Sequence, residues 1–345
     1  MRPYRFPVLV VIFFLFFKPA FTHTAQDTLN SAKEKKKFPV SGFIAFSINT
    51  LIAEGREYVC NHGSILSDLR WPLIPSVSYT VSGGVYFPKG IHLDGTVSFL
   101  QPMHTGTMID RDFQGIGQSP LMSGVTEFSE HKCSIIDGIR GTAKLGLQLP
   151  MPQTAAMQKT GIAVLVEPMI SVHCSTISWY SYDGYLQYAN KKKDGSYEPW
   201  SRNLPKIPIF GPVISYRQQL VIPAIGVGFE ASFPHNLSVF SDFHVNSGII
   251  AVGEDIHYTR NERFVDIIGN GWAVHGTTRL SWQCLPYFSV FFSLFYEYSI
   301  SLEGRTVHFS GINARKPNGI SQFNAAGTSL YGCTFSSGIA FVLGR

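Results

Sequence analysis

The sequence is poor in charged residues and has no apolar run long enough for a membrane-crossing helix. Charged residues make up 15% of the chain, against ~25% in ordinary soluble domains. The longest apolar run, from Phe6 to Phe17, is shorter than the ~18 residues that such a helix requires. The formal net charge is +5 and falls to +2 without Arg2, Arg5 and Lys18. These values argue against a helical membrane protein and against a nucleic-acid-binding protein.

Cysteines are scarce as well, and no helical pattern persists along the chain. The five cysteines show neither CxxC nor metal-ligand spacing, so we expect no metal site. Being odd in number, they cannot all pair within one chain, and most are interpreted as small apolar fillers. Because no 3.6-residue repeat of apolar positions persists, the sequence favours an all-β fold.

The N-terminal stretch resembles a leader rather than part of a domain. A basic start, a short apolar run and small residues after it are typical of a secretory signal peptide, which we assign to residues 1–25. Residues 26–38 are polar and lysine-rich, which predicts a flexible arm. The remaining residues, 39–345, are predicted to form one domain.

What the sequence does have is aromatic residues, glycine and long strand-like runs. Aromatics reach 14% of the chain, a composition that suits strands with one face in lipid. Ten runs with strand character follow one another, at 39–60, 64–86, 91–108, 130–149, 160–190, 209–233, 236–254, 259–282, 286–305 and 325–343.

The ninth run shows the clearest alternation. Its even-numbered positions from 288 to 302 are apolar or aromatic, whereas its odd positions are mostly Ser or Glu, interrupted by Phe291 and Phe295. Strands of soluble β-sandwiches average only ~5–6 residues, so a run of this length argues against that class. We therefore predict a ten-stranded antiparallel transmembrane β-barrel, with the even positions facing lipid. A barrel of this size has an interior largely filled by side chains, so a wide pore is not expected.

The connections between the runs alternate in length. Those near 149–153, 233–236 and 284–287 are short or marked by proline, and we assign them to the periplasmic side. The segments 109–129, 190–208 and 304–325 are longer and polar, and we assign them to the extracellular side. We expect the candidate catalytic residues to lie in loops on that outer side.

Two spaced pairs of polar residues carry the candidate chemistry. In an extended strand Asp255 and His257 share one face, so the carboxylate can hold the imidazole in one tautomer. Asp110 and Asp112 have the same spacing, and together the pairs could hold and deprotonate a water molecule. Asp255 and His257 have the parity of lipid-facing residues in the preceding run. Either a bulge near Gly248 or Gly253 resets the register, or the strand has already left the membrane; we favour the second explanation.

The order of these motifs resembles the omptin family of ten-stranded outer-membrane endopeptidases, from about Pro39 to Phe341. The matching segments are Met108-Ile-Asp110-Arg-Asp112-Phe, Gly253-Glu-Asp255-Ile-His257-Tyr, Leu69-Arg-Trp71, Ser129-Glu-His131 and Ser215-Tyr-Arg-Gln-Gln219 with the residues up to Gly226. The resemblance implies an aspartyl-type endopeptidase that is embedded in the bacterial outer membrane as a monomer. Its active site would face the cell exterior.

The resemblance also implies a role for each site residue. His257, oriented by Asp255, would be the general base, and Asp110 with Asp112 would position the attacking water. Glu57 would receive a basic side chain of the peptide or protein substrate. No cofactor is implied, apart from lipopolysaccharide or another outer-membrane lipid as a possible activator.

Two positions depart from the family pattern. Gly253 stands where the family has a second acidic specificity residue, so we expect a weaker preference for basic substrates. Gln219 stands where the family has an arginine that binds lipid phosphate, and Arg217 is the candidate substitute. These departures keep an alternative open, in which the chain is a catalytically decayed barrel that acts as an adhesin or structural protein.

Overall fold

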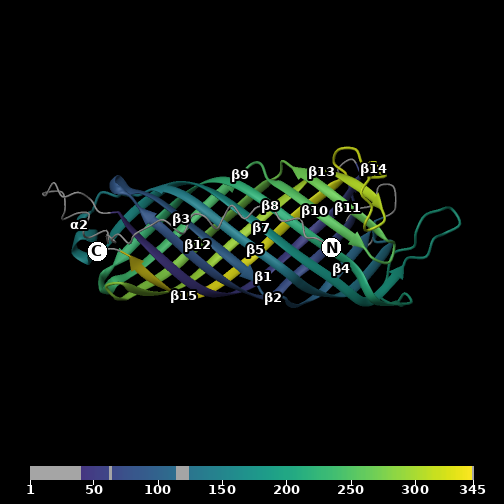
Figure 1. Cartoon of the computed structure of the whole chain (residues 1–345), viewed down its shortest axis with the longest axis horizontal. Helices are drawn as coiled ribbons and strands as arrows, with labels where there is room; N and C mark the ends of the chain where they lie inside the picture. The colour runs from purple at the N-terminus through teal and green to yellow at the C-terminus, as the bar shows by residue number, and fades with distance from the viewer. Residues whose placement is uncertain (1–39, 62–63, 114–123, 344–345) are drawn as a thin grey trace.

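The computed structural model describes residues 40–61, 64–113 and 124–343, so the predicted signal peptide and polar arm lie outside it. The described chain is almost entirely β-structure (Figure 1). None of its helices is long and apolar enough to cross a membrane. The strands are β1 Ser41–Asn61, β2 Ser64–Tyr86, β3 Ile91–Leu100, β4 Met103–Asp112, β5 Glu127–Leu147, β6 Leu149–Pro150, β7 Ala163–Tyr188, β8 Ile207–Phe233, β9 Leu237–Asn246, β10 Ile250–His257, β11 Glu262–Gly269, β12 Trp272–Leu285, β13 Phe288–Ser310, β14 Gly319–Ile320 and β15 Ala326–Leu343. The helical segments are η3 Pro88–Gly90, α2 Ala155–Thr160 and η5 Pro234–Asn236.

Hydrogen bonds join the strands into a closed antiparallel ring. At one level the ring runs β1, β2, β3, β5, β7, β8, β9, β12, β13 and β15, which pairs again with β1. Further along the molecule β4, β10 and β11 replace β3, β9 and β12 between the same neighbours. The ring therefore has ten strands at both levels, as the ten predicted runs require. A closed ring leaves no long sheet edge unpaired.

Three of the predicted runs are interrupted, each near the boundary between the two levels. The run 91–108 breaks between β3 and β4, the run 236–254 between β9 and β10, and the run 259–282 between β11 and β12. The prediction of uninterrupted strands was wrong at these places. The turn predicted at 149–153 is also longer than expected, because α2 follows it. Thr154 caps this helix by accepting a hydrogen bond from the Met157 backbone.

The break between β9 and β10 changes which side chains face the interior. Val245 lies opposite Ile225 of β8, but Ile250 lies opposite Val221. One extra residue has therefore been inserted, and such an insertion exchanges the two faces of a strand. Asp255 and His257 consequently lie on the buried face of β10. Of the two explanations, the reset near Gly248 is the correct one, and departure from the membrane alone was the wrong choice.

The outer surface has an apolar belt around the first level of the ring. On β13 the belt residue Phe292 is 64% exposed, whereas the odd-numbered Ser293 lines the interior. This alternation has the predicted parity. Exposed side chains of the belt include Phe46, Ile48, Ile52, Tyr79, Phe99, Ile139, Leu145, Ile170, Ile225, Phe229, Phe243, Leu280, Trp282, Phe292 and Phe335.

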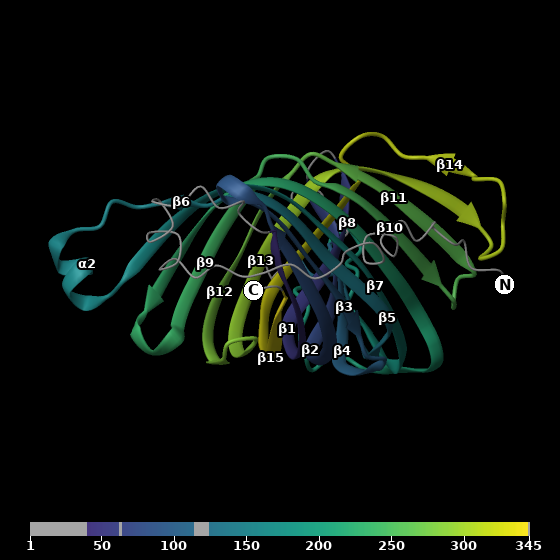
Figure 2. The same ribbon diagram turned by 60° about the vertical axis from the view of Figure 1, so that its left-hand side comes forward.

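Beyond the belt the ring continues with charged residues on its outer face. We call this part, formed by β4, β10, β11 and the adjoining ends of their neighbours, the extension. It lies at the end of the molecule opposite α2 (Figures 1 and 2). Its outward-facing charged residues are Glu54, Arg56, Arg70, Lys132, Arg217, Glu254 and Arg305. Charged side chains of both signs are costly against hydrocarbon, so they mark the limit of the apolar belt.

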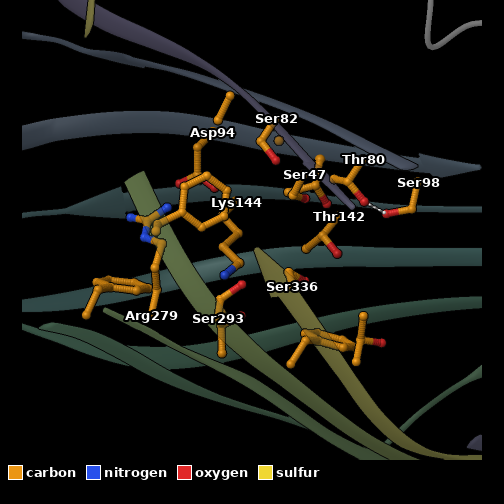
Figure 3. Close-up of a pocket in the computed structure, with 18 of the residues that line it drawn as sticks. Ser47, Thr80, Ser82, Asp94, Ser98, Thr142, Lys144, Arg279, Ser293 and Ser336 are labelled. Atoms are coloured by element: carbon orange, nitrogen blue, oxygen red, sulfur yellow. Dashed lines mark hydrogen bonds between the residues drawn. The ribbon is translucent and has the colours of Figure 1, made fainter. Parts of the chain in front are cut away.

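The interior at the level of the belt is polar. A cavity of about 170 Å³ lies there, and Figure 3 shows Lys144, Arg279 and Asp94 with several hydroxyl side chains around it. Arg140 pairs with Glu297, and Lys144 pairs with Asp242. Thr80 and Ser98 share a hydrogen bond of 2.5 Å across neighbouring strands. Pairing of this kind is what allows charged groups to be buried.

An apolar cluster separates this cavity from the extension. Along β1, Asn49 lines the cavity, Leu51 belongs to the cluster and Glu57 follows in the extension. Trp71 and Trp179 are completely buried. Tyr216 stacks against both of them, with ring centroids 5.5 Å from Trp71 and 5.9 Å from Trp179. The cluster forms a floor beneath the candidate site.

Candidate active site

Asp255 and His257 form a directly hydrogen-bonded pair on the inner face of β10. Nε2 of His257 lies 2.5 Å from Oδ2 of Asp255. The Asp255 side chain is 5% exposed and that of His257 is 11% exposed. Phe264 of β11 packs edge-on against the imidazole, with ring centroids 5.5 Å apart. The expected same-face arrangement is therefore present, but on a strand and not in a loop.

Asp110 and Asp112 end β4, although the loop was predicted to begin at residue 109. Oδ1 of Asp110 accepts a hydrogen bond of 3.1 Å from the Ser67 hydroxyl of β2. Burial raises the pKa of Asp110 well above its usual value, and the charge of Asp112 raises it further. Burial also raises the pKa of Asp112, whereas Ser67 lowers it. Two carboxyl groups this close do not easily both ionise.

The two pairs influence each other across the interior of the extension. The charge of Asp255 contributes to the raised pKa of Asp110, after burial and Asp112. His257 acts on Asp112 in the opposite direction and lowers its pKa, although burial dominates. The two pairs therefore lie on inner faces of the same ring, within Coulomb range of each other.

Glu57 lies in the same group of carboxyl groups. The residue is 2% exposed, and its Oε2 has no hydrogen-bond partner within the part of the chain that the structure describes. Burial raises its pKa strongly, and the charges of Asp255, Asp266 and Asp110 raise it further. A buried acid with an unpaired oxygen beside other acids is unstable as a free carboxylate and is suited to receive a cation.

Asp266 is a site residue that the sequence reasoning missed. It lies on β11, is 4% exposed, and accepts a hydrogen bond of 2.7 Å from Thr306. Its strand partner is Gly253, and a Cβ atom at Gly253 would lie only 3.5 Å from Cβ of Asp266. An acid thus lies opposite Gly253 on the next strand. No local motif indicates this position, because in the sequence Asp266 is a single acid within an ordinary strand-like run.

Arg260 is the second residue that the sequence did not indicate. It lies in the turn between β10 and β11, and its Nη2 contacts Nδ1 of His257.

Ser129, from the Ser-x-His motif, lies on β5 opposite Asp110 and is buried, not in a loop as predicted. Over the described ranges, no group of three or more His, Cys, Asp or Glu side chains is arranged to hold a metal ion.

Comparisons with known proteins concern the family and the fold of the chain. A model of the Omptin family matches residues 40–343. A search of curated proteins finds no match. Among solved structures, the outer membrane protease OmpT from Escherichia coli is similar, with 15% identity, a TM-score of 0.72, and coverage of 88% of this chain and 96% of that chain. The outer membrane protein OprG from Pseudomonas aeruginosa aligns with 4% identity over 88% of this chain and 96% of that one, but its TM-score of 0.35 supports no argument.

The family match has the same extent as the closed ring. It begins one residue before β1 and ends with the last residue of β15. The likeness to OmpT covers the same fold and not a fragment of it. This chain therefore belongs to the omptin family.

Proposed function

We propose that the protein is an outer-membrane endopeptidase that hydrolyses peptide bonds with a water molecule activated by His257. The observation that carries this proposal is the Asp255–His257 hydrogen bond of 2.5 Å on the inner face of β10, opposite the Asp110–Asp112 pair. Family membership supports the reaction class. The apolar belt supports a transmembrane β-barrel in a bacterial outer membrane.

The mechanism assigns one step to each pair. The Nε2–H group of His257 donates to Asp255, so Nδ1 is the nitrogen that accepts a proton. Asp110 and Asp112 hold the water on the other side of the peptide carbonyl. As the water attacks, its proton passes to Nδ1, and His257 then returns this proton to the leaving amine. Asp255 stabilises the imidazolium in between.

We further propose that the substrate has a basic side chain next to the cleaved bond. Glu57 and Asp266 are both buried, and the charge of Asp266 contributes to the raised pKa of Glu57. A Lys or Arg side chain placed between them would restore the charge balance that burial disturbs. The weaker preference expected from Gly253 stays a prediction, and the competing proposal is that Asp266 supplies the acid that Gly253 lacks.

The extension is proposed to face the cell exterior, where it can meet peptides, with the belt in contact with outer-membrane lipid. Arg217 and Gln219 lie on the outer face of β8. A contact between Arg217 and lipid phosphate is a proposal that follows from its position and charge. Action as a monomer also remains a proposal.

The alternative, a decayed barrel that acts as an adhesin, is less well supported. A decayed site has no reason to keep several acids and a histidine together in the interior, since removing charged groups from water costs free energy. Each of these residues is retained on the inner face of its strand.

The experiment is a peptide-cleavage assay on refolded protein with and without lipopolysaccharide. Unmodified protein should cleave, and His257→Ala should lower kcat by ~10²–10⁴, as is typical of losing a general base. Heat-modifiable gel mobility shows that each variant is folded. Tyr258→Phe, which alters the neighbouring exposed residue, should retain the rate. Equal activity of His257→Ala and unmodified protein would rule out the mechanism, and inactivity of the unmodified protein would favour the decayed barrel.

A further inference from the structure

Arg260 lies against the imidazole of the proposed general base. Its Nη2 is close to Nδ1 of His257 and lies 3.2 Å from Nε2 of the same ring. A donor aligned with the Nδ1 lone pair would lie in the ring plane and much farther from Nε2, so the guanidinium lies over the ring. Nε2 faces Oδ2 of Asp255.

The same guanidinium lies between the two walls of the site. Burial raises the pKa of both Asp112 and Glu127, and the Arg260 charge lowers the pKa of each. Asp112 and Glu127 are strand partners on β4 and β5, across the interior from β10. The Arg260 charge therefore lies against His257 and within Coulomb range of Asp112 and Glu127.

This contact cannot persist through the reaction. While the guanidinium lies against the ring, its charge disfavours transfer of a proton from water to Nδ1. Once protonated, the imidazolium would also repel the neighbouring guanidinium. The side chain has room to move, because it is 58% exposed and its ion pair with Glu262 is long, at 3.6 Å from Nε.

We propose that Arg260 is a further catalytic residue, which leaves Nδ1 of His257 for the carbonyl oxygen of the scissile peptide and stabilises the oxyanion there. The inference rests on the proposed function. The water oxygen bonds to the carbonyl carbon, the C=O π pair moves to the oxygen beside Arg260, and the water proton moves to Nδ1. The C=O bond then reforms, the C–N bond breaks, and Nδ1 returns its proton to the amine. At the intermediate, the guanidinium faces the oxyanion and the imidazolium faces Asp255, so each cation has an anion.

The test compares Arg260→Ala with a matched control in the same hairpin. Arg263→Ala removes a cation whose guanidinium stacks on Phe309 and whose Nη1 lies 3.5 Å from Glu254. Because this is a change on the outer surface, the rate of the variant should remain within about threefold of that of the unmodified protein. Arg260→Ala should lower kcat by ~10²–10³, the usual effect of removing an oxyanion donor, with KM changed far less. Added methylguanidinium should restore part of the rate to Arg260→Ala and none to His257→Ala. All variants must first show the heat-modifiable mobility of the folded ring.

Each outcome decides the question. An Arg260→Ala variant as active as the unmodified protein, or more active, would show that Arg260 only covers His257 when no substrate is bound. The catalytic role would then be abandoned. A loss of rate that methylguanidinium does not restore would assign Arg260 a structural role and would also overturn the inference. Unmodified protein that cleaves no peptide overturns the proposed function itself. If the unmodified protein cleaves peptides, either of the first two results overturns only the role of Arg260 and leaves the proposed function standing.

Discussion

Glu57 and Asp266 place two acids beside the buried ring of Tyr216, next to the candidate catalytic residues. A Cβ atom at Gly253 would lie 3.2 Å from the Tyr216 hydroxyl and 3.5 Å from Cβ of Asp266. A side chain at 253 would therefore compete with Asp266 for the same space. The small residue and the acid on the neighbouring strand fit each other, and the two are best considered together.

Replacing these acids should weaken the preference for basic substrates. Glu57→Gln and Asp266→Asn should each reduce the ratio of cleavage rates for Arg-containing and Ala-containing peptides by about tenfold or more. A charged hydrogen bond contributes ~1.5–3 kcal/mol, which corresponds to that factor. Profiling a peptide library measures the ratio. Glu254→Gln changes an acid one position away on the outer face and should leave it unaffected. An unchanged ratio in the double variant would exclude this pocket as the source of specificity.

Asp266 also predicts a pH dependence of stability. Burial raises its pKa from 3.8 to about 7; Thr306 opposes this and the charge of Asp255 adds to it. The folded state therefore holds this proton more tightly than the unfolded state, and stability contributed by protonation is lost as the pH rises through about 7. Asp266→Asn should stabilise the protein at pH 8 by more than ~1 kcal/mol relative to its effect at pH 5. Thermal unfolding in detergent at both pH values tests this, and an equal effect at both would contradict it.

At the scale of single strands, β13 carries the alternation that distinguishes the belt from the interior. Its odd-numbered residues Phe291, Ser293 and Phe295 line the cavity, while Phe292 between them is exposed. A residue on the outer face contacts lipid along the whole belt, so an apolar side chain is favoured there at every second position.

Spin labels on this strand should separate the two faces. In a background without the five native cysteines, labels at positions 290 and 294 should be accessible to a lipid-soluble relaxant, and labels at 289 and 293 should not. Power-saturation measurements in bilayers give both accessibilities. If 289 and 293 were the more accessible pair, the assignment of the belt would be reversed.

Across the whole molecule, the interior is divided into a polar cavity and a site with an apolar floor between them. The floor consists of closely packed side chains from most strands, including Leu73, Ile177 and Leu220, all of which are at most 1% exposed. Water and ions cross such a layer only at high cost, since it offers no hydrogen-bond partners. The ring is thus closed to the passage of water and ions, although its interior at the level of the belt is polar.

The protein should therefore insert into planar bilayers without forming a conducting channel. Unmodified protein is expected to show no stable current steps, because the Trp71, Trp179 and Tyr216 cluster fills the lumen. The double variant Trp71→Ala and Trp179→Ala should allow brief, small openings, since truncating buried aromatic residues leaves a cavity. Steady conductance of the unmodified protein would contradict the closed interior and favour a pore function.

Much of the architecture follows from the sequence alone. The ten runs are visible because lipid on one side and packed side chains on the other impose a two-residue period on every strand. The four residues of the two pairs are visible because Asp-x-Asp and Asp-x-His place their side chains on one face of an extended chain. Glu57 was indicated by the family resemblance. None of these patterns depends on knowing which strands are neighbours.

The features that the sequence could not determine depend on which strands pair and in which register. The inserted residue near Gly248 turns Asp255 and His257 inward, and its effect appears only in the register against β8. Asp266 becomes a site residue because it is the partner of Gly253 on the next strand. Arg260 belongs to the site because a turn brings it back onto His257. Contacts between strands are decided by register and closure of the ring, which no single strand encodes, and the tertiary structure therefore determined the composition of the site.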